Sequence, residues 1–190
     1  KQSEQRAAEL AIVNSVQAAL AAKLDVQAIH QLVGDKVRDV FDAQSVLIAL
    51  FDHEQQIEVF TYSWEKGEYA IDPPRPINRL RRHLIDTRRS HVDLRITDEV
   101  VAYWQAVPLG DTPMPKSAVF VPMLVGDEVK GYVSIQNVDR FEAFTDADVR
   151  LLETLTGSLA VAFENARLFD ETQRLLKETE QRNAELAVIN

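Results

Sequence analysis

The sequence predicts an α+β fold in which antiparallel strand pairs lie between helices at the two ends of the chain. Two apolar runs, 117–125 and 129–137, are rich in β-branched and aromatic residues and flank the turn Gly126-Asp127-Glu128, which indicates a β-hairpin. A second strand pair, 45–51 and 57–64, is joined by a polar turn. The chain ends contain no proline before residue 41 or after Thr145, and their apolar residues recur at helical spacing.

The composition is that of a globular protein with a hydrophobic core, because 46% of its 190 residues are hydrophobic and 27% are charged. No apolar run approaches the roughly 20 residues needed to span a bilayer, and the start has no signal-peptide pattern. We therefore expect a cytoplasmic location without direct membrane contact, although a fragment of a membrane-anchored chain would look the same. A net charge of −9 disfavours nucleic acid as a partner. The absence of cysteine excludes disulfides, zinc-thiolate sites, thiol catalysis and thioether-linked chromophores.

The N-terminal region predicts two helices. The first, 1–24, repeats apolar residues at Leu10, Val13 and Leu20, and a break is expected at Leu24-Asp25, where Asp25 can cap the second helix. The second helix carries one apolar stripe, which consists of Val26, Ile29, Leu32, Val33, Val37 and Val40. Such a stripe requires a packing partner, which the sheet can supply.

The strands differ in their patterns. The first, 45–51, is almost continuously hydrophobic and predicts a central position covered on both faces. The second alternates, with Tyr62 and Trp64 on the side of Glu58, and is expected near an edge or a pocket. In the hairpin, Val133 and Ile135 point to one face while Ser134 and Gln136 point to the other. That second face either lines a pocket or is half solvated.

The middle of the chain, 65–116, is irregular and holds six of the seven prolines. It predicts a helix near 77–87, a short strand near 91–94 and a helix near 98–106. Seven of the fourteen arginines fall between positions 75 and 95. They form either an anion-binding rim or a solvated face that balances nearby carboxylates. Arg75 and Arg79 are the better ligand candidates because they flank the proline-rich loop.

The last helix is expected to start at Thr145, with Asp148 in a near capping box, and to continue to Asn190. Its coiled-coil-like apolar stripe runs from Leu152 to Leu176. Residues 177–190 match residues 1–14 at nine of fourteen positions, which indicates an internal repeat with an offset of 176 residues. The chain is therefore interpreted as one unit of a tandem array: a connecting helix (1–24), a domain (25–170) and a second connecting helix (171–190).

Three stretches resemble the GAF domain family. The first is the strand with Val121-Pro122-Met123, the second is the turn and strand 126–137, and the third is the last helix with Glu164-Asn-Ala-Arg-Leu-Phe169. The resemblance spans roughly residues 10–170. It implies an antiparallel sheet of five or six strands, with the first and last helices on one face and the variable middle on the other.

In that family, small molecules bind between the second face of the sheet and the variable middle. Transferred to this chain, the resemblance implies a ligand site with nine candidate residues: Tyr62, Trp64, Arg75, Arg79, Asp93, Trp104, Ser117, Ser134 and Gln136. Plain core packing is the alternative role for the aromatic members of this set.

Departures from family subtypes narrow the ligand. Cyclic-nucleotide-binding members carry Asn-Lys and Asp-Glu steps, whereas here Val138 follows Asn137 and Val149 follows Asp148. Bilin attachment through cysteine, like the cysteine-dependent methionine sulfoxide reductase chemistry, is excluded by composition. Haem needs an axial histidine, for which His83 and His91 are the candidates, but a lone histidine in an arginine-rich helix is more often solvated. The cofactor is therefore left open, with cyclic nucleotide and haem disfavoured.

The sequence contains no glycine-rich phosphate loop, no HExxH and no nucleophile elbow, so no enzyme is predicted. We expect a sensory module of a signal-transduction protein, such as a two-component sensor kinase or a cyclase-like regulator, next to another GAF unit or an output domain. It would bind a small molecule and form a homodimer through its terminal helices. The alternative is a dimerisation spacer without a ligand.

Overall fold

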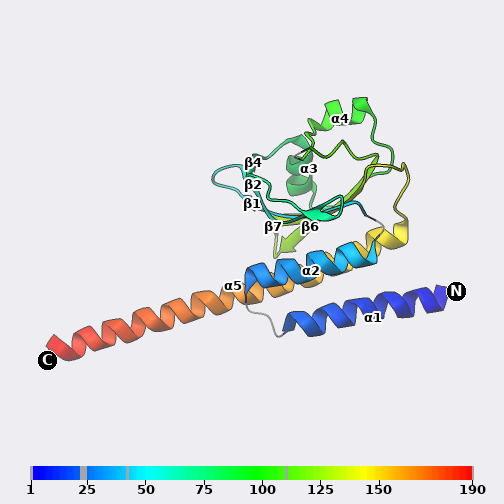
Figure 1. Ribbon diagram of the computed structural model, residues 1–190. Helices are drawn as coiled ribbons and strands as arrows, with labels where there is room; N and C mark the ends of the chain where they lie inside the picture. The colour runs from blue at the N-terminus through cyan, green and yellow to red at the C-terminus, as the bar shows by residue number, and fades with distance from the viewer. Residues whose placement is uncertain (1, 22–24, 42, 110, 190) are drawn as a thin grey trace.

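The computed structural model, which describes residues 2–21, 25–41, 43–109 and 111–189, has three layers (Figure 1). Its helices are α1 (Gln2–Ala21), α2 (Val26–Val40), α3 (Arg79–Thr87), α4 (Asp98–Trp104) and α5 (Asp146–Ile189). Helices α1, α2 and the first part of α5 lie on one side of a sheet, and α3 and α4 lie on the other. The predicted α+β class and its division into two helical sides are confirmed.

The sheet is antiparallel, with the strand order β3-β2-β1-β7-β6-β5, and β4 also pairs with β2. Its strands are β1 (Ser45–Asp52), β2 (Ile57–Glu65), β3 (Glu68–Tyr69), β4 (Arg75–Pro76), β5 (His91–Asp93), β6 (Ser117–Val125) and β7 (Glu128–Asn137). Strands β6 and β7 form the predicted hairpin, and β1 lies centrally between β2 and β7. The two-residue strands β3 and β4 extend the sheet only at its β2 edge.

A bulge in β2 changes which side chains share a face. Ile48 pairs with Tyr62, but the next residue, Ala49, pairs with Phe60, so Thr61 is an extra residue in the ladder. The alternation of side chains is therefore reversed on the two sides of Thr61. As a result, Phe60 faces the α3 side of the sheet, whereas Tyr62 belongs to the core on the helix-covered side.

The main hydrophobic core lies between the sheet and the layer of α1, α2 and α5. Val133 and Ile135 of β7 are fully buried there, as predicted from their alternation. They belong to one cluster with Leu155 and Leu159 of α5 and Val33 of α2. Burying a side chain of this size contributes about 1.5–3 kcal/mol, so this face supplies much of the stability of the fold.

The helix boundaries follow the predicted caps. The Asp25 carboxylate accepts a hydrogen bond of 3.0 Å from the backbone N–H of Ala28, which begins α2. At α5, the Thr145 backbone N–H donates to the Asp148 carboxylate (2.7 Å), and the Asp148 N–H donates to the Thr145 hydroxyl (3.2 Å). This is the predicted capping box with Asp in place of Glu. The expected break at Leu24 falls outside the described residues.

Helix α5 is much longer than the domain that it packs against. The helix has 44 residues, and Ala166 is the last buried one among those whose burial is described; the part beyond it extends away from the sheet (Figure 1). Within the described ranges, no helix is both long enough and apolar enough to cross a membrane.

Candidate functional site

A cavity of about 470 Å³ lies between the sheet and the middle of the chain. Residues of β1, β2, β6 and β7 form its floor, and α4 with residues 105–109 and 112–115 forms its roof. Its lining is mostly apolar and includes Leu80, Ile96, Val101, Trp104, Ala118 and Phe120. Volume and lining both match a small-molecule pocket, which is typically about 300–1,000 Å³ and apolar with a few placed polar groups.

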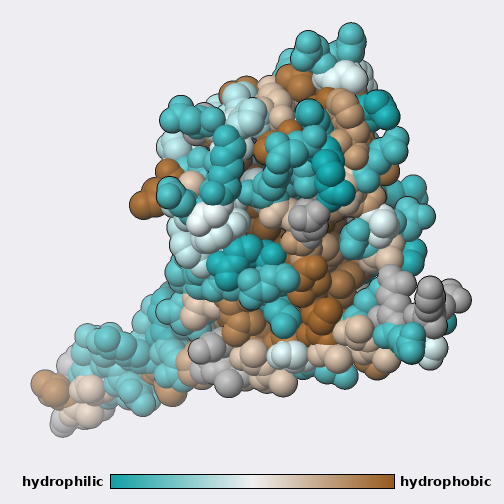
Figure 2. Space-filling view, turned by 45° about the vertical axis from the view of Figure 1, so that its right-hand side comes forward, coloured by the Kyte–Doolittle hydropathy of each residue, from teal (hydrophilic) through white to brown (hydrophobic). Residues whose placement is uncertain are grey.

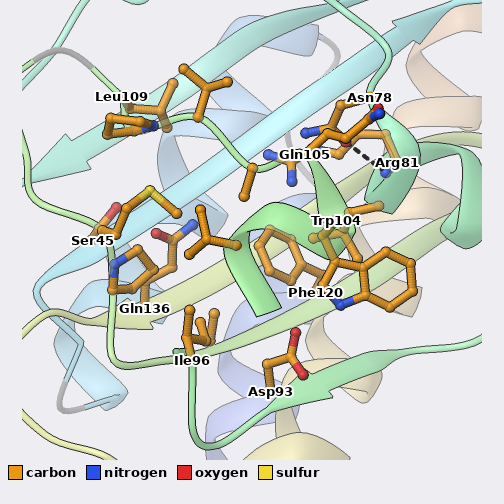
Figure 3. A pocket seen from close by; sticks show the side chains of 18 of the residues that line it. Ser45, Asn78, Arg81, Asp93, Ile96, Trp104, Gln105, Leu109, Phe120 and Gln136 are labelled. Carbon is orange, nitrogen blue, oxygen red and sulfur yellow. Dashed lines mark hydrogen bonds between the residues drawn. The ribbon is translucent and has the colours of Figure 1, made fainter. Parts of the chain in front are cut away.

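The polar groups of the cavity lie at opposite ends (Figure 3). Asn78 and Arg81 are at one end, and Ser45 and Gln136 are at the other. The ring of Phe120 lies between them, and the Trp104 ring lies beside Phe120 on the Arg81 side. A bound molecule would thus contact an apolar centre and a polar group at each end.

A buried charge pair closes the α3 end. The Arg81 guanidinium donates from Nε to a Glu58 carboxylate oxygen (3.0 Å) and from Nη2 to the Tyr132 hydroxyl (2.9 Å). The Tyr132 hydroxyl in turn donates to the same Glu58 oxygen (2.7 Å). Burial raises the pKa of Tyr132 well above its ordinary value, which keeps the hydroxyl protonated as a donor. Arg81 also lies over the rings of Phe120 and Tyr132, at 4.9 and 4.8 Å. These contacts fix α3 to the sheet.

Glu65 is the carboxylate at the other end of the cavity. One of its oxygens accepts a hydrogen bond from the Thr112 hydroxyl in the roof. Its Oε1 is shielded from solvent and has no hydrogen-bond partner in the described part of the chain. Burial raises the pKa of Glu65, and the Thr112 hydrogen bond opposes that shift in part.

The roof is attached to the rest of the domain by a few polar contacts. Arg75 donates from Nη1 to the Pro108 carbonyl oxygen (2.8 Å). Arg79 donates to the Tyr103 carbonyl oxygen (3.3 Å) and lies 4.0 Å over the Tyr103 ring. Every residue of α4 keeps some solvent exposure. Such a segment opens at a lower free energy than the packed core.

Two histidines lie beside the cavity in an aromatic cluster. His83 and His91 contact Trp104 with ring centroids 5.1 and 4.8 Å apart, and His91 Nε2 is 2.7 Å from an Asp93 oxygen. Neither histidine lines the cavity. In the described ranges, no group of three or more His, Asp or Glu side chains could hold a metal ion.

Four of the nine residues expected to bind ligand line the cavity: Arg75, Asp93, Trp104 and Gln136. Ser134 points to the same face but is fully buried, and its hydroxyl oxygen accepts a hydrogen bond from the Gln136 side-chain amide (3.2 Å). Arg79 lies outside, where it holds Tyr103.

The other three expected residues lie on the opposite face of the sheet. The bulge at Thr61 turns Tyr62 and Trp64 toward the helices. There the Tyr62 hydroxyl donates to Asp35 of α2 (2.9 Å), and Trp64 stacks under the Arg38 guanidinium (4.6 Å). Ser117 shares the face of Val119 and Val121 because side chains alternate along β6. Its hydroxyl donates to the Arg140 carbonyl oxygen (2.9 Å) and stabilises the loop after β7.

Sequence reasoning missed Glu58, Arg81, Glu65 and Ser45. The sequence did contain one signal for Glu58. It lies two positions before Phe60, so the two side chains share one strand face, and a face with an aromatic side chain is expected to be covered. A buried carboxylate requires a cationic partner, but nothing in the sequence distinguishes Arg81 from the six other arginines of the middle. Glu65 was not predicted as a cavity residue because the bulge at Thr61 moves its side chain to the cavity face.

Comparison with known proteins supports the architecture. The GAF domain family model matches residues 23–164. No curated protein is similar enough to this chain to count as a relative. Among solved structures, the GAF domain of an Acinetobacter phosphoenolpyruvate-protein phosphotransferase has a TM-score of 0.65 at 15% identity, over 84% of this chain and 94% of that one.

Two further structures share the fold. Free methionine-R-sulfoxide reductase from Neisseria meningitidis, solved in complex with its substrate, has a TM-score of 0.65 at 16% identity, over 83% of this chain and 89% of that chain. Residues 122 to 287 of a methyl-accepting chemotaxis protein give a TM-score of 0.65 at 16% identity, over 81% of this chain and 98% of that chain. At these identities the likeness establishes the fold.

Proposed function

The chain belongs to the GAF domain family, and from that premise we propose that it is a non-catalytic sensory or regulatory module that binds a small molecule in the roofed cavity. The observation that supports this most is the cavity itself, which is mostly apolar and has polar groups at both ends. A cavity of this size in a domain of this length is a cost to stability unless a ligand fills it. One structural relative is part of a chemotaxis protein and another was solved with its substrate.

The signal would travel through strands that serve both faces of the sheet. Gln136 lines the cavity, whereas its neighbour Ile135 is packed against the helical layer. A shift of β7 on ligand binding would therefore act on the packing of α2 and α5. Helix α5 continues beyond the domain and would carry the change to an adjacent GAF unit or output domain.

The test is a thermal-shift and native mass spectrometry screen with nucleotides, amino acids, tetrapyrroles and small acids. A compound at 100 times its Kd stabilises the folded state by about 2.7 kcal/mol. Val100 lines the cavity from α4, so Val100→Trp should fill the space and abolish this gain. Ala102→Trp adds the same bulk at an exposed position of α4 and should preserve it. If no compound stabilises the wild type more than Val100→Trp, the proposal is wrong.

A second candidate function is a dimerisation spacer. Beyond Ala166, apolar residues at heptad-related positions of α5 are exposed, including Leu168, Phe169, Leu175 and Leu176, and Figure 2 shows this projecting end as largely hydrophilic with apolar spots. A second copy would bury them in a parallel pair of helices. Sedimentation of the isolated chain should show a dimer, and Leu168→Glu with Leu175→Glu should give monomers. A wild-type monomer at high micromolar concentration would exclude this role.

A further inference from the structure

A row of side chains crosses the cavity face of five strands. Glu65 of β2 pairs with Ser45 of β1, and Ser45 pairs with Gln136 of β7. Gln136 then pairs with Ala118 of β6, and Ala118 with Asp93 of β5. All five residues line the cavity. Because adjacent strands are about 4.8 Å apart, the first three members lie within reach of one bound group.

These first three members present acceptors that the protein does not use. Glu65 Oε1 is buried without a partner in the described part of the chain, and no hydrogen bond joins the Ser45 side-chain hydroxyl to a described residue. The Gln136 side-chain amide donates an N–H to Ser134, and no hydrogen bond from the described residues reaches its side-chain carbonyl oxygen. A buried acceptor without a donor costs free energy, which applies to Glu65 Oε1, and the two further acceptors beside it make this end of the cavity complementary to a group rich in N–H donors.

The charged side chains around the cavity indicate that the bound donor group is positively charged. Glu58 is neutralised by Arg81, and Asp93, at the far end of the same row, is bound by His91. Arg75 donates to the Pro108 carbonyl oxygen of the roof. Burial raises the pKa of Glu65 and outweighs the charges of Arg75 and Lys66, which favour the ionised form; the charge of Asp72 opposes that form. Glu65 has only the neutral Thr112 hydroxyl as a hydrogen-bond partner, and burial disfavours its ionised form. A cation beside Oε1 would relieve this desolvation.

We propose that the cavity recognises a protonated organic amine, whose ammonium group donates to Glu65, Ser45 and Gln136 and whose apolar body lies between Trp104 and Phe120. The ammonium group has three donors, which match the three acceptors of the row. This inference rests on the proposed ligand-binding function and specifies its ligand class.

The test uses three probes that share a phenyl body: 2-phenylethylamine, 2-phenylethanol and phenylacetate. Their affinities for the full chain are measured at pH 7 by calorimetry or ligand-observed NMR. Charge-assisted hydrogen bonds predict that the amine binds about 10- to 100-fold more tightly than the alcohol, and that phenylacetate binds most weakly. Glu65→Gln keeps the size of the side chain and should remove most of the preference for the amine.

The matched control is Glu68→Gln, which makes the same carboxylate-to-amide change at an exposed position of β3 outside the cavity lining. It should leave the amine preference unchanged. Equal or tighter binding of phenylethanol or phenylacetate, or an unchanged preference in Glu65→Gln, would overturn the inference while the ligand-binding function stands. If none of the probes binds, the inference also fails, and the library screen with Val100→Trp then decides the function separately. Circular dichroism of each variant confirms that it is folded.

Discussion

The two faces of the sheet are built from the same strands but differ in what they bury. The helix-covered face is apolar and filled, with Ile135 and Leu155 among its fully buried side chains. The cavity face buries the Arg81–Glu58 pair and leaves a hollow of about 470 Å³. The difference indicates that one face supplies stability, whereas the other holds polar groups in place around a space for a ligand.

The largest effect is expected when the charge pair of the cavity face is broken. Arg81→Met leaves the Glu58 carboxylate buried without its cation and should lower the free energy of unfolding by about 3–5 kcal/mol. Adding Glu58→Gln removes the stranded charge, so the double variant should recover part of that loss. Urea denaturation measures the free energy of unfolding of both variants. A double variant no more stable than Arg81→Met would show that the pair does not act as a unit.

Substitutions at two adjacent positions of β7 allow the stability contributions of the two faces to be compared directly. Ile135→Ala opens a hole in the filled core and should cost about 2–5 kcal/mol. Gln136→Ala only enlarges an existing cavity, and its cost should stay below about 1 kcal/mol. Chemical denaturation of the two variants measures the loss in free energy of unfolding at each position. Similar losses at both positions would contradict the division between the faces.

A buried histidine makes the packed face sensitive to acid. His30 of α2 is fully buried, stacks against Phe163 of α5 with ring centroids 5.8 Å apart, and has no hydrogen-bond partner for either ring nitrogen among the described residues. Burial lowers its pKa to about 4, from an ordinary value of 6.5. Below pH 6.5 the unfolded chain therefore binds a proton that the folded chain does not.

The stability contributed by neutral His30 is present above pH 6.5 and is lost as the pH falls toward 4, by about 3 kcal/mol in total. His30→Leu removes this titration but leaves the other ionisable groups in place. The free energy of unfolding of the wild type should therefore fall more steeply than that of the variant across this range. Parallel pH profiles would show that His30 is protonated at its ordinary pKa.

The smallest effect concerns a glycine outside both faces. Gly157 of α5 is exposed, and a Cβ added there meets no atom within 4 Å. Gly157→Ala should stabilise the protein by up to about 1 kcal/mol through helix propensity alone. At Gly34 of α2, an added Cβ would lie 2.4 Å from the Tyr62 ring, so Gly34→Ala should instead be destabilising. Thermal melting of the two variants should give shifts of opposite sign.

The sequence predicted the elements and the faces of β7, because its side chains alternate regularly over Val133–Gln136. It failed for Tyr62 and Trp64, since a single extra residue at Thr61 reverses the alternation and leaves no mark on the pattern of residue types. The partnership of Arg81 with Glu58 joins α3 to β2 across 23 residues, and only the folded arrangement selects it. Regular alternation within a strand and the pairing of neighbouring strands could be predicted from the sequence, whereas the bulge in β2 and the contact between Arg81 and Glu58 could not.

The chain carries one tryptophan on each face, Trp64 under the helices and Trp104 in the cavity, so fluorine NMR can show on which face a ligand binds. The protein is labelled with 5-fluorotryptophan, and its two fluorine NMR resonances are followed during titration with the amine probe and the compound library. A cavity ligand should shift the Trp104 resonance to saturation, and by more than it shifts the Trp64 resonance on the opposite face. A library that moves neither resonance, or a ligand that moves only Trp64, would contradict the assignment of the cavity face as the ligand site.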